Sequence, residues 1–187
     1  MKGAGSVERG EYLRLFCALR LPSTATAELA VWQDEALAGA GLRVVAEAHL
    51  HVTLAFLGRR PAGDLEPVAT ALRDAAAGVR PPVLTISRYR ETRSVGMLVC
   101  DDEGGRATQL ADSLHERLER LGVYERERRE WLPHVTVVRF RERPRLQPEL
   151  PQLGPIVTSE AAVYMSVLRP SGAQYEVLQS VALGEGS

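Results

Sequence analysis

The chain has 187 residues, 45% of them hydrophobic and 25% charged, a composition typical of a folded globular domain. Its 23 basic and 24 acidic residues nearly balance, which argues against a uniformly basic nucleic-acid binder, and its two cysteines, Cys17 and Cys100, lie too far apart for a disulfide scaffold or a cysteine-rich zinc site. No apolar run is long enough to cross a membrane, and the N-terminus does not resemble a secretory signal, so we expect a cytoplasmic protein with no membrane partner.

Strand and helix periodicities alternate along the chain. In order, the pattern predicts a strand at 13–21, a helix at 25–37, strands at 42–46 and 49–57, a helix at 64–79, strands at 83–90 and 95–100, a helix at 108–121, and strands at 134–140, 156–168 and 175–183. The segments 124–131 and 141–155 are expected to be irregular, and His115 is expected to face solvent. This order predicts an α+β fold with antiparallel sheets, folded as one domain over residues 1–187.

One short motif occurs twice. Residues 51–54 read HVTL and residues 134–137 read HVTV, one copy in each half of the chain. A repeat of this kind indicates a duplicated unit. On a strand, residues i and i+2 point to the same side, so His51 shares a face with Thr53, and His134 shares a face with Thr136. The same rule predicts that the alternate residues of the first copy are buried, namely Leu50, Val52, Leu54 and Phe56.

Two imidazoles and two hydroxyls that meet between the halves would suit proton transfer. A neutral imidazole accepts a proton and a charged one donates it, while threonine hydroxyls donate hydrogen bonds to an anionic oxygen. Either motif alone reads most simply as part of an ordinary strand, because threonine favours strands and histidine is often a core residue. The matched pair favours a site that uses no metal.

The segments AHLHVTLAFLG (48–58) and LPHVTVVRF (132–140) resemble the two signature motifs of the 2H phosphoesterase superfamily. Within it, the chain is most similar to the bacterial RNA 2′,3′-cyclic phosphodiesterases, also called 2′-5′ RNA ligase-like proteins. LRLFCALRLP (13–22) resembles that family's first strand, and VYMSVLRPSGAQYEVL (163–178) resembles its closing hairpin. The resemblance covers almost the whole chain.

This resemblance implies a bilobal duplicated fold, with two antiparallel sheets facing a central cleft and helices on the outside. It implies that His51 and His134 are catalytic, that Thr53 and Thr136 bind the substrate phosphate, and that no cofactor is needed. The implied activity is hydrolysis of RNA 2′,3′-cyclic phosphate ends to 2′-phosphates by a monomeric enzyme. Alternatives are hydrolysis or ligation of 2′-5′ linkages, or an RNA-binding module without activity. We assign His51 as the acid and His134 as the base, although nothing in the sequence itself distinguishes the two histidines.

Three further residues are candidates. Arg139 stands where the family often has a phosphate-binding arginine, although strict alternation would turn it away from Thr136; a twist or bulge would restore it. His49 begins an H-x-H pattern, but no acidic or cysteine partner has metal-ligand spacing, so we expect a supporting role near the site. Trp131 precedes the second motif and is a candidate for stacking on a base or for core packing.

Overall fold

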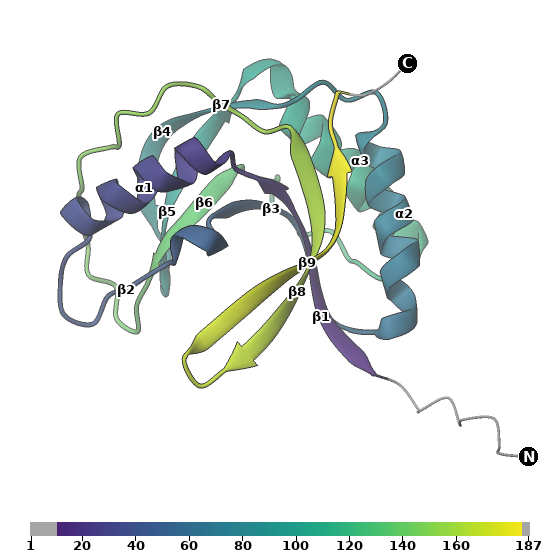
Figure 1. Ribbon diagram of the computed structural model, residues 1–187, viewed down its shortest axis with the longest axis horizontal. Coiled ribbons are helices and arrows are strands. Elements are labelled where there is room, and N and C mark those ends of the chain that lie inside the picture. The colour runs from purple at the N-terminus through teal and green to yellow at the C-terminus, as the bar shows by residue number, and fades with distance from the viewer. Residues whose placement is uncertain (1–10, 185–187) are drawn as a thin grey trace, which may run out of the picture.

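The computed structural model describes residues 11–184 and contains one nine-stranded sheet with three α-helices (Figure 1). The helices are α1 (Ser23–Ala36), α2 (Leu65–Ala76) and α3 (Arg106–Arg120). The strands are β1 (Tyr12–Arg20), β2 (Arg43–Val44), β3 (His51–Pro61), β4 (Val83–Glu91), β5 (Val95–Asp102), β6 (His134–Arg139), β7 (Ile156–Val157), β8 (Glu160–Arg169) and β9 (Gly172–Ala182). The α+β prediction is confirmed, and the element order follows the predicted one closely.

The sheet is strongly curled and entirely antiparallel, with the order β7-β4-β5-β6-β3-β1-β8-β9 and β2 beside β6. The two halves meet where β3 and β6 pair through a single pair of residues, Val52 and Val135. The two predicted sheets are therefore joined into one, because the motif strands touch at one point and then diverge. This junction brings the two copies of the motif side by side.

The helices lie outside the sheet, as predicted. Figure 1 shows α1 beside the half that holds β4, β5 and β6, and α2 with α3 beside the half that holds β1, β8 and β9. Both groups of helices bury apolar residues in one continuous core. The core side of β1 carries Leu15, Cys17 and Leu19, all fully buried. The opposite side of the sheet is therefore left for other functions.

The predicted strand 156–168 is divided between the two halves. Ile156 and Val157 form β7, which pairs with β4 at one edge of the sheet, whereas Glu160 begins β8 beside β1. The buried Thr158 lies between them and donates its backbone N–H and its hydroxyl to Pro82 O, at 2.9 and 3.2 Å. The chain crosses from one half to the other at this point. Within residues 11–184, no helix has the length and apolar content needed to span a bilayer.

The irregular segment after β6 is held by one buried carboxylate. The side chain of Glu91, only 2% exposed, accepts hydrogen bonds from Tyr89 Oη (3.2 Å), Arg143 Nε (3.1 Å), Arg145 N (3.0 Å) and Leu146 N (2.7 Å). Because backbone N–H groups away from water need acceptors, this carboxylate fixes the path of the segment. The segment starts directly after the second motif, so Glu91 also restrains the end of β6.

Candidate active site

The two His-x-Thr motifs lie on β3 and β6, and both strands have the same burial pattern over six residues. In each copy the histidine and threonine are half-buried, the residue between them is buried, the next two residues are buried, and the sixth is exposed. We call the side of the sheet that bears His51, Thr53, His134 and Thr136 the site face. The sequence alone located these four residues, and the pairing of Val52 with Val135 places them near one another.

A β-bulge follows the threonine in both copies. On β3, Thr53 faces Ala18 and Ala55 faces Cys17, so Leu54 is the extra residue. A bulge shifts the alternation of side chains by one position, so Phe56 returns to the site face. The prediction that Phe56 is buried was therefore wrong: it is 50% exposed, because Leu54 and Ala55 both turn toward the core.

The bulge on β6 determines on which side of the sheet Arg139 lies. On β6, Thr136 faces Met97 and Val138 faces Gly96, so Val137 is the extra residue. Arg139 consequently lies on the same side as Thr136, at the position equivalent to Phe56 on β3. Its positive charge is one of the causes that lower the pKa of His51.

The orientation of both imidazoles is fixed by the main chain. His51 Nδ1 donates to His49 O at 2.7 Å, and His134 Nδ1 donates to Leu132 O at 2.8 Å. A backbone carbonyl only accepts hydrogen bonds, so each neutral ring carries its proton on Nδ1 and has a lone pair on Nε2. His51 Nε2 accepts from Thr53 Oγ1 at 3.0 Å. In both neutral rings, Nε2 is therefore the nitrogen that can accept a proton.

The first imidazole is held neutral in the free protein. The pKa of His51 is lowered from 6.5 to about 4, mainly by burial and also by the positive charges of His134, Arg139 and His49, while the hydrogen bond to His49 O acts in the opposite direction. At neutral pH only about 0.1% of His51 would be protonated. Its Nε2 is thus a proton acceptor when the site is empty.

Aromatic rings surround His51, and the sequence analysis missed them. The ring of Phe16 on β1 lies 5.0 Å from that of His51, and Tyr175 on β9 lies 4.6 Å from His49 and 5.5 Å from His51, measured between ring centroids. Tyr164 stacks on Phe16 at 4.9 Å. These residues come from strands distant in the sequence, so only the sheet order reveals them. His49 itself lies in a short 3₁₀ turn (Glu47–His49) just before β3, not in the strand.

Two side chains hold the backbone of the first motif from behind. Trp131 is half-buried against the core, and its Nε1 donates to Thr53 O at 3.0 Å. His115 is 3% exposed, and its Nε2 lies 2.7 Å from Leu54 O. The prediction that His115 faces solvent was wrong, because its ring turns from α3 toward β3 to satisfy a carbonyl at the bulge. Trp131 thereby connects the approach to the second motif with the first motif.

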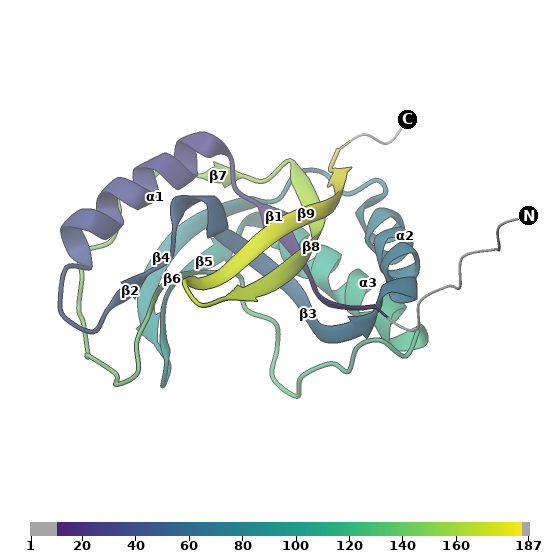
Figure 2. The same cartoon turned by 60° about the horizontal axis from the view of Figure 1, so that its bottom comes forward.

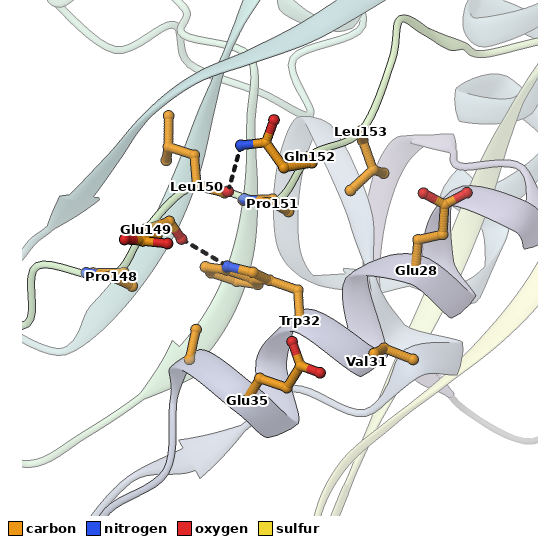
Figure 3. A pocket seen from close by; sticks show the side chains of 11 residues that line it. Glu28, Val31, Trp32, Glu35, Pro148, Glu149, Leu150, Pro151, Gln152 and Leu153 are labelled. Atoms are coloured by element: carbon orange, nitrogen blue, oxygen red, sulfur yellow. Dashed lines mark hydrogen bonds between the residues drawn. The ribbon is translucent and has the colours of Figure 1, made fainter.

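One groove is lined by residues of α1 and of the segment 148–153 (Figure 3), and neither His51 nor His134 lines it. It has a volume of about 640 Å³ between α1 and residues 148–153, and Trp32 Nε1 donates to Glu149 O across it at 2.8 Å. Its rim carries Glu28, Glu35 and Glu149, which would repel a phosphate. Among residues 11–184, no three His, Cys, Asp or Glu side chains gather closely enough to hold a metal ion.

Comparisons with known proteins agree with the resemblance seen in the two motifs. Residues 19–94 match the model of a family described as LigT like Phosphoesterase. A protein of Methanocaldococcus jannaschii named RNA 2′,3′-cyclic phosphodiesterase is 22% identical over 175 residues, which cover 89% of this chain and 99% of that protein.

Two solved structures extend the similarity to the fold. Escherichia coli LigT complexed with NADP⁺ is 28% identical, with a TM-score of 0.77, covering 92% of this chain and 98% of its own. The protein TT0787 of Thermus thermophilus is also 28% identical, with a TM-score of 0.80, covering 94% of this chain and all of its own. The similarity thus extends over both halves of the sheet.

Proposed function

We propose that the chain is a LigT-like phosphoesterase of the 2H superfamily, and that it hydrolyses RNA 2′,3′-cyclic phosphate ends to 2′-phosphates with His51 and His134. One observation carries the proposal. In both motifs a backbone carbonyl holds Nδ1, so that two matched Nε2 atoms are available for proton transfer at the junction of the halves. The name of the Methanocaldococcus jannaschii relative supports the choice of substrate.

The proposed step needs one base, one acid and water. The base takes a proton from water, the resulting oxygen attacks phosphorus, the P–O3′ bond breaks, and the acid protonates O3′. Attack and departure are roughly in line, so the two imidazoles act on opposite sides of phosphorus. On substrate binding, Thr53 would turn its hydroxyl from His51 Nε2 to a non-bridging oxygen, which would leave that nitrogen free. Thr136 would donate to a non-bridging oxygen as well, and the guanidinium of Arg139 would balance the negative charge.

The lowered pKa of His51 favours the base role for this residue in the free enzyme. The sequence alone suggested the opposite assignment, with His51 as the acid. Both assignments place the same single proton on the pair, so the pH dependence of kcat/KM has the same shape for both and does not separate them. A substrate with a leaving group of low pKa separates them, because its departure needs no acid. Replacing the acid then costs little, whereas replacing the base still costs about 100-fold.

The test of this function measures hydrolysis of a 2′,3′-cyclic nucleotide by the untreated enzyme and, in a parallel reaction, by enzyme treated with a chelator. We expect hydrolysis that survives chelation and yields the 2′-monophosphate, resolved from the 3′-isomer by chromatography. Loss of activity that one metal restores would contradict the metal-free mechanism. A 2′-5′-linked dinucleotide in the same assay tests the alternative substrate. Arg120→Ala, on the exposed surface of α3, is a control variant with an unchanged rate.

A further inference from the structure

An exposed row of aromatic and arginine side chains leads away from the candidate active site along β1 and β3. It consists of Phe56 and Arg59 on β3 and Arg14 and Tyr12 on β1, and we call it the arginine–aromatic row. Figure 2 shows the two strands running side by side away from β6. All four side chains are exposed, and Phe56 and Tyr12 are 50% and 52% exposed. Aromatic rings with this exposure do not contribute to the packing of the hydrophobic core.

The register of the strands places this row on the site face. Thr53 faces Ala18, Phe56 faces Phe16, Arg59 faces Arg14, and Pro61 faces Tyr12. β3 has a second bulge at Leu57, just before Gly58, whose φ is +70°. Like the bulge at Leu54, it brings two residues that are three positions apart, here Phe56 and Arg59, to the same side of the sheet. From Phe56, which faces Phe16, to Tyr12 the row extends about 13 Å at ~3.3 Å per residue.

The row is organised by stacking of guanidinium groups on rings. Arg14 lies over the ring of Phe56, with Cζ 5.0 Å from the centroid, and Arg59 lies over Tyr12 at 4.3 Å. Within residues 11–184 neither arginine forms an ion pair. The adjacent Arg60, which points to the other side, pairs with Asp64 at 2.8 Å. The row therefore offers positive charge that no described carboxylate neutralises.

This combination suits one class of ligand. Exposed aromatic rings stack on unpaired bases, and guanidinium groups bind phosphate and stack on planar groups. The row also begins at the motif itself, since Phe56 occupies on β3 the position that Arg139 occupies on β6. At about 3.4 Å per stacked nucleotide, a row of about 13 Å accommodates at most about four nucleotides.

We propose that the arginine–aromatic row binds the single-stranded RNA that leads 5′ from the cyclic end, so that the enzyme prefers oligonucleotides to mononucleotides. This inference rests on the proposed function for the placement of the cyclic end. Bases stack on Phe56 and Tyr12, and the connecting phosphates contact Arg14 and Arg59. Duplex RNA does not fit, because its bases are already paired and stacked.

The test compares a 2′,3′-cyclic mononucleotide with a single-stranded RNA hexamer that carries the same cyclic end. The wild-type KM is expected to be at least tenfold lower for the hexamer. Tyr12→Ala and Arg59→Ala should each raise the ratio of hexamer KM to mononucleotide KM about 5- to 10-fold, whereas Arg120→Ala leaves it unchanged. Arg59→Lys, which keeps the charge but loses the planar group, should fall between. An unchanged ratio in the Tyr12 and Arg59 variants overturns the proposal.

A binding experiment keeps this proposal separate from the proposed function. Fluorescence anisotropy measures the affinity of the whole protein for a labelled RNA hexamer with an ordinary 3′ end, which requires no turnover. Tyr12→Ala should weaken binding about 5- to 10-fold, and Arg59→Ala should also reduce the dependence of log K on log salt by about 0.7. The proposal for the arginine–aromatic row would be overturned if the protein bound duplex RNA as tightly as the single-stranded hexamer. It would also be overturned if the Tyr12 and Arg59 variants bound the hexamer like the wild type and had an unchanged melting temperature. Absence of turnover with intact hexamer binding would overturn only the proposed function.

Discussion

Replacing Glu91 should destabilise the protein more than any exposed ion pair does. In Glu91→Ala, Arg145 N and Leu146 N lose their acceptor, and part-buried donors without partners cost about 1–3 kcal/mol each before water replaces some of the bonds. The ion pair with Arg143 adds little, because the Arg143 side chain is 57% exposed. We therefore expect a loss of about 2–4 kcal/mol for Glu91→Ala and only about 0.5–1 kcal/mol for Arg143→Ala.

Urea unfolding followed by tryptophan fluorescence measures both variants, and thermal melting gives a second value. At about 2–4 °C per kcal/mol for a chain of this size, Glu91→Ala should melt roughly 5–15 °C below the wild type. Glu91→Gln keeps one acceptor oxygen and turns the other toward a donor as an amide N–H₂, so it should fall between. Equal losses for Glu91→Ala and Arg143→Ala would refute the reasoning, because they would show that the ion pair, not the backbone donors, provides the stability.

Four other predictions concern the site and the core. His51→Ala and His134→Ala should each reduce kcat/KM for a cyclic nucleotide about 100-fold or more, and Thr53→Val and Thr136→Val should reduce it less; a near-normal rate in either histidine variant contradicts the pair. The pKa of His51 is about 4 when folded and 6.5 when unfolded, so the unfolded chain binds the proton first as pH falls. The wild type should therefore lose up to about 2 kcal/mol of stability between pH 7 and pH 5, and His51→Gln should lose less in urea titrations at the two pH values. Gly96→Ala should lower the melting temperature markedly, because an added Cβ would lie against Tyr89 Oη and 2.7 Å from Val138 Cγ1. Burial raises the pKa of Cys17 and Cys100 to about 12, so a thiol reagent at pH 8 should react only when the chain unfolds, and rapid labelling of the native protein would be inconsistent with their burial.

Local patterns were sufficient to predict most elements and the four residues of the motifs. The alternation around His51 and His134 indicated strands, and the leucines of α3 at helical spacing indicated a helix. Both signals depend only on neighbouring residues. The roles of His51, His134, Thr53, Thr136 and Arg139 in catalysis stay predictions until the variants are measured.

The errors arose where the local rule was interrupted by a contact distant in sequence. Strict alternation assigned Phe56 to the core, because a bulge is defined by the partner strand and leaves no certain mark in the motif. His115 looked solvated on its helix, yet Leu54 O, 61 positions away in the chain, accepts its hydrogen bond. Phe16 and Tyr175 gave no chemical signal of their own, and only the order of β3, β1, β8 and β9 brings them to His51.

The bulges on β3 make this strand tolerant of one change in length and sensitive to another. Deleting Leu54 would remove the extra residue of the first bulge, so that Ala55 would still face the core and Phe56 would still lie on the site face. Deleting a residue from a regular stretch of the strand, such as Val52 between His51 and Thr53, would instead turn the side chains beyond it to the opposite face. A change of one residue in length is therefore neutral for the arrangement of the site face at Leu54 and disruptive two positions away.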